Sequence, residues 1–168
     1  MWLFSRYISV SSKGILQGMT DCHSHLLPGV DDGVRTAEES LRILEEMERQ
    51  GIRKLWLTPH IMEDIPNTTD ALKTRFRTLC ESYRGNIRLE LAAEYMLDNL
   101  FVRRLEADDI LPLHEEKCYL LVETSYFNPP MRLLSMLKHI QEKGYHPLLA
   151  HPELSLIHIS EPTRRSYI

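Results

Sequence analysis

The amino-acid sequence predicts an α/β protein built as an incomplete parallel (β/α) barrel, and three observations support this prediction. Short apolar segments typical of strands alternate with segments of helical periodicity. Each of the five expected strands ends at or beside a histidine or glutamate, and these residues recur about every thirty residues, the spacing of βα units. Five strands do not close a barrel, so we expect its first five units. The recurring residues are His23, His60, Glu94, Glu123 and His151.

The first segment is expected to be a strand carrying His23 and His25 on one face, because side chains alternate with period two. Their imidazole nitrogens can then meet at one metal ion. Cys22 falls on the opposite face, where we expect it to pack. Asp21 lies two residues before His23 and supplies either a metal ligand or an anchor for a ring.

An acidic pair, Asp31-Asp32, follows in a glycine-containing loop and can supply metal ligands or anchors for the histidine rings. Asp31 is expected to shape the turn before Gly33 rather than to bind metal. Asp32 is either a ligand or a group that orients a ligand imidazole, and we favour the ligand.

A helix is predicted from Thr36 to Gly51. Thr36 and Glu39 have the spacing of a capping box, and Gly51 suits the helix end. The next strand covers 52–57 and ends in Thr58-Pro59-His60.

A second helix is expected over 69–84, and the strand that follows covers 86–93 and ends at Glu94. The third helix is predicted at 99–107. The fourth strand, 118–122, is almost wholly apolar, as in a strand covered on both faces, and ends at Glu123. A fourth helix opens at Pro129-Pro130 and ends at Gly144, and a fifth strand over 147–150 leads to His151.

Composition narrows the class of protein. With 168 residues and 43% hydrophobic residues, the chain suits one soluble domain. A net charge of −4 argues against nucleic-acid binding, and no apolar run has membrane-spanning length. Three widely spaced cysteines favour a reducing, cytoplasmic location. Residues 1–18 are expected to be an N-terminal arm.

The end of the chain has an unusual sequence. Leu154 to Arg164 corresponds, codon by codon, to a one-frame translation of a transposase-type sequencing adapter. We therefore expect residues 154–168 to be a non-native tail. The alternative is a natural strand-like segment with a turn at Pro162.

With these motifs placed, the chain resembles the PHP (polymerase and histidinol phosphatase) superfamily. The resemblance covers roughly residues 19–153, and its nearest branch is the bacterial manganese-dependent tyrosine phosphatases of capsule and exopolysaccharide control. The matching segments are Asp21-x-His23-x-His25-x-Leu27-Pro28-Gly29-x-Asp31-Asp32-Gly33, Thr58-Pro59-His60, Glu94, Leu121-Val122-Glu123-Thr124 and Ala150-His151-Pro152-Glu153.

The resemblance implies a distorted (β/α)₇ barrel with up to three metal ions, usually Mn²⁺, with iron or zinc as alternatives. It also implies a phosphotyrosine protein as substrate, in particular a bacterial tyrosine kinase that governs polysaccharide synthesis. The nucleophile would be hydroxide formed on the metal, so no side-chain nucleophile is expected. The implied metal ligands are His23, His25, Asp32, His60, Glu94, Glu123 and His151.

Two departures from the family pattern are visible. An arginine that binds phosphate normally follows His-Pro-Glu, but Leu154 stands there, and a later Asp-x-His pair is not reached. The departures raise the second of two alternatives that stand beside the tyrosine phosphatase. One is a PHP phosphoesterase acting on a small molecule such as histidinol phosphate, and the other is an inactive truncated fragment. Among ordinary structural roles, His60 could serve in a turn, and Glu94 and Glu123 could form salt bridges.

Overall fold

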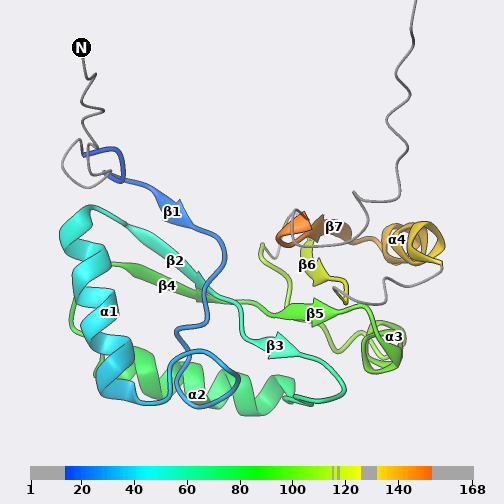
Figure 1. Ribbon diagram of the computed structural model, residues 1–168, viewed down its shortest axis with the longest axis horizontal. Helices are drawn as coiled ribbons and strands as arrows, with labels where there is room; N and C mark the ends of the chain where they lie inside the picture. The colour runs from blue at the N-terminus through cyan, green and yellow to red at the C-terminus, as the bar shows by residue number, and fades with distance from the viewer. Residues whose placement is uncertain (1–13, 115, 117, 126–131, 153–168) are drawn as a thin grey trace, which may run out of the picture. The chain divides into compact units, whose positions relative to one another are not determined.

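The computed structural model describes residues 14–114, 116, 118–125 and 132–152 (Figure 1). They form two compact units, of which the first runs to Thr58 and also contains Lys73–Leu91. The second contains Pro59–Leu72 and the described residues from Ala92 onward. Each unit has a parallel sheet of its own, so the predicted α/β class with parallel strands is confirmed.

The first unit contains a three-stranded sheet in the order β1-β2-β4. Both neighbouring pairs are parallel. The central strand, β2, is buried along most of its length, which fits its apolar sequence. The strands are β1 (Thr20–Asp21), β2 (Lys54–Leu57) and β4 (Arg88–Leu91).

Helix α1 (Ala37–Gln50) begins and ends as its sequence predicts. The Thr36 hydroxyl accepts a hydrogen bond from the Glu39 backbone at 3.2 Å, and Gly51 ends the helix with a left-handed φ of 108°. The reciprocal bond differs from the expected capping box. The Glu39 carboxylate accepts from the backbone N–H of Arg35, one residue before the cap, at 3.2 Å.

Helix α2 (Thr69–Ser82) ends before a loop that is tied to α1. The Glu48 carboxylate accepts hydrogen bonds from the Tyr83 hydroxyl at 2.9 Å and from the Asn86 side-chain amide at 2.7 Å. These bonds hold the pKa of Glu48 below its usual value, with the Asn86 bonds the largest cause. The polar contacts thereby fix the chain between α2 and β4.

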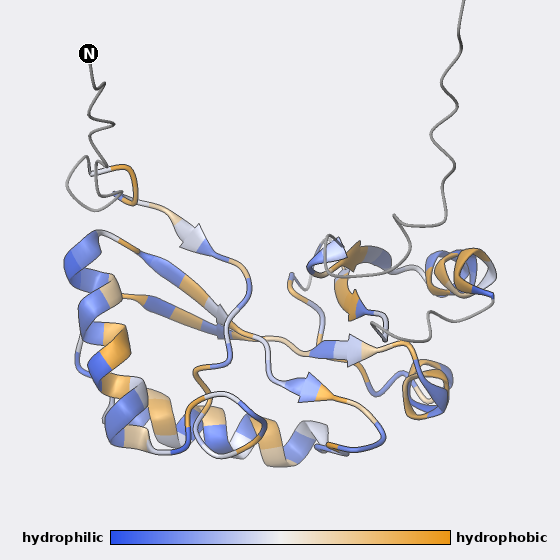
Figure 2. Cartoon of the chain, in the orientation of Figure 1, coloured by the Kyte–Doolittle hydropathy of each residue, from blue (hydrophilic) through white to orange (hydrophobic). Residues whose placement is uncertain are grey.

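The second unit contains a four-stranded sheet in the order β3-β5-β6-β7, and every neighbouring pair is parallel. β6 is buried after its first residue and is drawn in the apolar colour in Figure 2. This burial confirms the prediction of a strand covered on both faces. The strands are β3 (His60–Ile61), β5 (Glu94–Met96), β6 (Tyr119–Glu123) and β7 (His146–Leu149).

Two of the five expected strands are interrupted, which the sequence analysis did not foresee. β2 stops at Leu57, and β3 begins three residues later at His60. Pro59 lies in this gap and has no N–H to donate to a ladder. β4 likewise stops at Leu91, and β5 begins at Glu94. His60 and Glu94 therefore begin strands, and the expectation that they end strands was wrong.

Two helices belong to the second unit, α3 (Asn99–Glu106) and α4 (Leu133–Glu142). Asp98 caps α3 by accepting from the Phe101 backbone at 2.9 Å. The Glu106 carboxylate bonds Lys143 Nζ and His139 Nε2, each at 2.6 Å, which ties the end of α3 to α4 and the residue after it. α4 contacts β7.

Within the described ranges, no helix has both the length and the apolar character needed to cross a membrane. Three sequence predictions concern positions outside these ranges. They are the arm up to residue 13, the helix opening at Pro129-Pro130 and the tail 154–168.

Candidate metal centre

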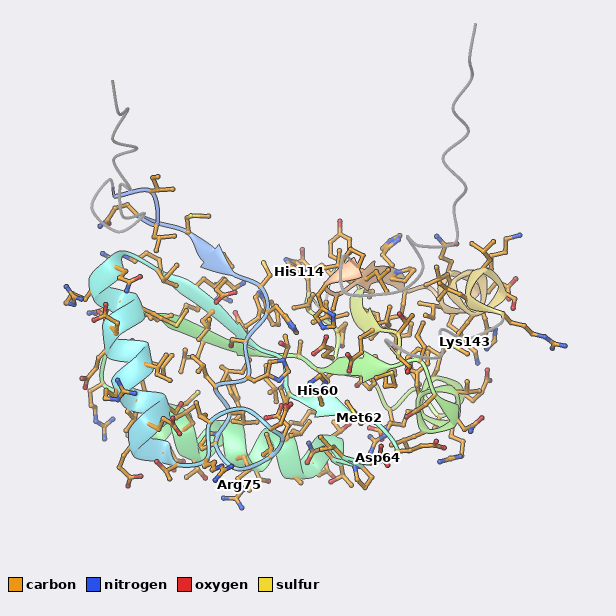
Figure 3. The ribbon with its side chains drawn as sticks, viewed as in Figure 1. His60, Met62, Asp64, Arg75, His114 and Lys143 are labelled. Atoms are coloured by element: carbon orange, nitrogen blue, oxygen red, sulfur yellow. The ribbon has the colours of Figure 1, made fainter. Side chains whose placement is uncertain are left out.

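The second unit carries a cluster of two carboxylates and two imidazoles on its sheet. β3 and β5 pair with His60 directly opposite Glu94, and β5 and β6 pair with Met96 opposite Glu123. Neighbouring strands thus deliver Glu94 and Glu123 to the same region, and His60 lies on β3 (Figure 3). His151 follows β7 by two residues.

The side chains of this cluster converge closely. His60 Nδ1 lies 2.9 Å from Glu123 Oε1 and 3.2 Å from Glu94 Oε2. His151 Nε2 lies 2.9 Å from Glu94 Oε1 and 3.8 Å from Glu123 Oε2. The two oxygens of Glu94 therefore face different histidines. One donor atom each from His60, Glu94 and Glu123 lies within 4.8 Å of the others, which is close enough to surround one ion.

Burial of two carboxylates in this cluster is electrostatically unfavourable unless positive charge lies beside them. The Glu94 and Glu123 side chains are 0% and 3% exposed, and the His60 side chain is 13% exposed. Two buried carboxylates repel each other and lose their hydration, so positive charge is needed beside them. A divalent cation held by these side chains would supply it. Imidazole nitrogens with carboxylate oxygens are a donor set that suits manganese, iron or zinc.

The backbone at His151 is also unusual. Its φ is 30°, in the region that L-residues rarely adopt. Such conformations cost free energy, persist only where the surroundings enforce them and are concentrated at functional sites. Here the conformation accompanies the hydrogen bond between His151 and Glu94 at 2.9 Å.

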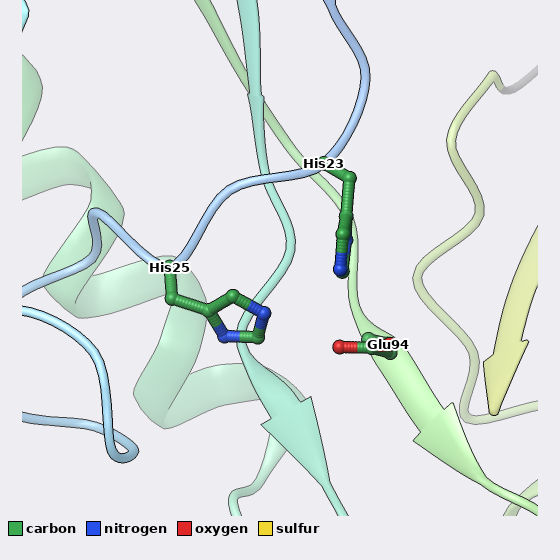
Figure 4. A group of neighbouring side chains, drawn as sticks. All are labelled: His23, His25 and Glu94. Carbon is green, nitrogen blue, oxygen red and sulfur yellow. The ribbon is translucent and has the colours of Figure 1, made fainter. Parts of the chain in front are cut away.

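The first unit holds the His-x-His pair, but on a loop and not on a strand. β1 ends at Asp21, so the expectation of a strand through His23 and His25 was wrong. Their rings nevertheless lie together, with centroids 5.1 Å apart and an interplanar angle of 83° (Figure 4). Cys22 is exposed, so the expectation that it packs was also wrong.

Hydrogen bonds position both rings from the Nδ1 side. His23 Nδ1 lies 2.8 Å from the Thr58 hydroxyl, and His25 Nδ1 lies 2.8 Å from Asp31 Oδ2. Nε2 is then the atom that each ring can offer to a metal. A partner on the opposite ring nitrogen is the usual arrangement for metal-binding histidines, because it sets the tautomer and the ring direction.

The loop around these histidines is closely packed. Asp31 Oδ1 accepts from the Gly33 backbone at 3.0 Å, which confirms the turn predicted for Asp31. A Cβ at Gly33 would lie 2.3 Å from the His25 carbonyl oxygen, so only glycine fits there. Asp21 acts on the backbone, accepting from His23 N at 3.1 Å. Asp32 is exposed, and one of its oxygens lies within 4.8 Å of a His25 nitrogen.

One anchoring role was missed from the sequence. Thr58 is fully buried, and its hydroxyl contacts His23 and accepts from Ser24 N at 3.0 Å. The contact of Asp31 with His25 agrees with the anchoring role considered for the acidic pair. A hydroxyl at the end of a buried strand, just before Pro59-His60, was the available signal for Thr58.

The fold and the clustered side chains define this chain as a parallel α/β protein with a candidate metal centre. The chain belongs to the family described as capsular polysaccharide synthesis, CpsB/CapC, whose model matches residues 19–159. The family resemblance drawn from the sequence is thereby confirmed.

The chain is also similar to named tyrosine-protein phosphatases. Tyrosine-protein phosphatase CpsB of Streptococcus pneumoniae is 31% identical over 141 residues, covering 80% of this chain and 57% of its own length. Tyrosine-protein phosphatase YwqE of Bacillus subtilis is 29% identical over 142 residues, which cover 80% of this chain and 54% of the length of YwqE. The chain thus spans about half the length of the curated relatives it matches.

A solved structure also resembles the chain. It comes from work on YwqE from Bacillus subtilis and CpsB from Streptococcus pneumoniae, described as unique metal-dependent tyrosine phosphatases. The TM-score is 0.68 at 26% identity, with 82% of this chain and 57% of the other covered.

Proposed function

We propose that this chain is part of a metal-dependent protein-tyrosine phosphatase, which hydrolyses phosphotyrosine in proteins. The observation that carries the proposal is the buried cluster of His60, Glu94, Glu123 and His151 on the four-stranded sheet. Membership of the CpsB/CapC family and the tyrosine-phosphatase names of the relatives supply the substrate class.

Metal ions are proposed to bind through the cluster of the second unit and through the loop residues of the first. The residues fit this role, because buried carboxylates beside imidazoles need a cation and both loop histidines are oriented from Nδ1. Glu94 directs its two oxygens to different histidines, so it would hold metal together with both His60 and His151. The proposed ligands are His23, His25, Asp32, His60, Glu94, Glu123 and His151.

The chemistry follows from the charge of the substrate. A phosphate monoester is a dianion, and divalent cations neutralise its oxygens and activate water near neutral pH. The protein's own part is to fix ligand positions. Strand pairing holds Glu94 and Glu123, and Thr58 and Asp31 orient the loop histidines.

The identity of the metal, the location of the protein and its particular substrate are proposals as well. We propose Mn²⁺ as the metal, a cytoplasmic location and, as substrate, a bacterial tyrosine kinase that controls capsule or exopolysaccharide synthesis. The family description, which concerns capsular polysaccharide synthesis, supports the last of these. We also propose that the two parallel sheets belong to an incomplete PHP-type (β/α)₇ barrel, since their strands alternate with helices.

The test is turnover of a phosphotyrosine peptide by this chain with added Mn²⁺. We expect phosphate release that depends on the metal and is abolished by Glu123→Gln. Glu142→Gln, which changes an exposed glutamate on α4, is the matched control and should leave the rate unchanged. Metal-dependent turnover of histidinol phosphate, with none of the peptide, would contradict the proposal.

A further inference from the structure

A cationic groove lies in the first unit, and none of its lining residues is among those assigned above to metal binding. It has a volume of about 240 Å³ and lies between the loop at Pro28 and helix α2. Arg35 and Arg75 line it, and Figure 3 labels Arg75 on α2. The lining contains no acidic side chain. Its charge therefore favours an anionic occupant.

The two arginines are available to such an occupant. Both are exposed, and neither guanidinium forms an ion pair with a carboxylate in the described ranges of the chain. The Glu39 carboxylate, although close to Arg35 in sequence, accepts from its backbone N–H. Guanidinium groups bind carboxylates through paired, charge-assisted hydrogen bonds.

Two hydroxyls on α2 make the groove different from a simple anion site. Thr78 donates to the Thr74 carbonyl at 3.2 Å, and Ser82 donates to the Thr78 carbonyl at 3.0 Å. Since their protons are engaged with the helix, these oxygens present lone pairs to the groove, where they can accept from N–H groups. The buried Leu79 adds an apolar floor. Carboxylates with adjacent N–H groups and aliphatic stems are features of an acidic peptide.

The groove is structurally linked to the histidine loop. Gly29 lines it and donates to the Val34 carbonyl at 2.9 Å, while Val34 donates to the His25 carbonyl at 3.1 Å. Gly29 has a φ of 68°, in the left-handed region that favours glycine. A segment bound in the groove would thus contact the same loop that carries His25.

From these observations we propose that the groove binds aspartate or glutamate side chains that flank the phosphotyrosine of a protein substrate. Arg35 and Arg75 would hold the carboxylates, and Thr78 and Ser82 would accept from peptide N–H groups. This inference rests on the proposed phosphatase function and adds a preference for acidic sequences. The groove is then a specificity determinant distinct from the metal ligands.

Binding is tested with fluorescent peptides in which phenylalanine replaces the phosphotyrosine, flanked by glutamates or by glutamines. We expect roughly three- to tenfold tighter binding of the acidic peptide, the range for two partly exposed ion pairs. The double variant Arg35→Gln, Arg75→Gln should remove the difference. Arg77→Gln, an exposed arginine also on α2, should retain it.

Equal affinities in the unmodified chain, a difference that survives the double variant, or its loss in Arg77→Gln would each overturn the proposal. Displacement of the acidic peptide by millimolar inorganic phosphate, dependent on Arg35 and Arg75, would make this a phosphate site and also overturn it. Turnover separates this inference from the proposed function. If no phosphotyrosine peptide is hydrolysed while the acidic preference persists, the phosphatase proposal fails and the groove stands.

Discussion

The two units present candidate metal ligands in different ways. In the second unit Glu94 and Glu123 project from paired strands and are almost fully buried. In the first unit His23 and His25 lie on a loop and are half-buried. Strand ladders position a side chain through many backbone bonds, whereas a loop depends on a few side-chain anchors. The strand-borne side chains of the second unit should therefore hold their positions without further support. The loop histidines of the first unit should depend on the side chains that anchor them.

The largest effect is expected from a ligand of the buried cluster. Glu94→Gln removes a charge that faces both His60 and His151. We expect Mn²⁺ affinity to fall by more than about 100-fold, beyond the range found when only an outer anchor of a ligand is removed. Calorimetric titration with Mn²⁺ measures this, and circular dichroism checks the fold. An equal loss of Mn²⁺ affinity in the control Glu142→Gln would show that the effect is not specific to the buried cluster.

A smaller effect is expected from the loop anchor. Asp31→Asn keeps the size of the side chain but weakens its charged contact with His25. We expect Mn²⁺ affinity to fall by about 10- to 100-fold, the usual cost of losing an anchor behind a metal-binding histidine. Glu38→Gln, an exposed residue on α1, serves as the control in the same titration. Unchanged affinity in Asp31→Asn would show that the loop needs no such anchor.

The third prediction concerns the stability of the folded protein and not its affinity for metal. Thr58→Val removes a buried hydroxyl that contacts His23 and Ser24. We expect the free energy of unfolding to fall by about 1–3 kcal/mol, because the partners of the hydroxyl are left unsatisfied. Urea denaturation measures the loss. Thr58→Ser restores the hydroxyl and should recover most of it, and failure to recover would point to packing instead.

The smallest effect is expected at two surface carboxylates, the half-buried Glu48 in the first unit and the exposed Glu106 in the second. Hydrogen bonds lower the pKa of Glu48 through Asn86, and of Glu106 through Lys143 and His139. A carboxyl whose folded pKa is depressed stabilises the fold above its unfolded pKa, and this contribution is lost as pH falls through the folded value. Melting temperatures should therefore decrease below about pH 4.3. Glu48→Gln and Glu106→Gln should each flatten this decrease, and unchanged profiles would contradict it.

Much of the site could be anticipated from local sequence. The spacing of Thr36, Glu39 and Gly51 predicted α1 almost to the residue. The apolar run before Glu123 predicted a buried strand that ends in a carboxylate. The ordered set of motifs also predicted the CpsB/CapC family. The helix and the strand depend on neighbours within a few residues, and the family is shown by the order of motifs along the chain, so the sequence alone contains these features.

Other features were decided only by the tertiary structure. The register that sets His60 opposite Glu94 and the placement of Thr58 against His23 each join residues distant in sequence. Parallel pairing and side-chain anchoring depend on which segments meet in space. The periodicity of a local sequence does not specify which distant segment will pair with it. The sequence therefore determined which residues could bind metal, and the tertiary structure determined how each one is held.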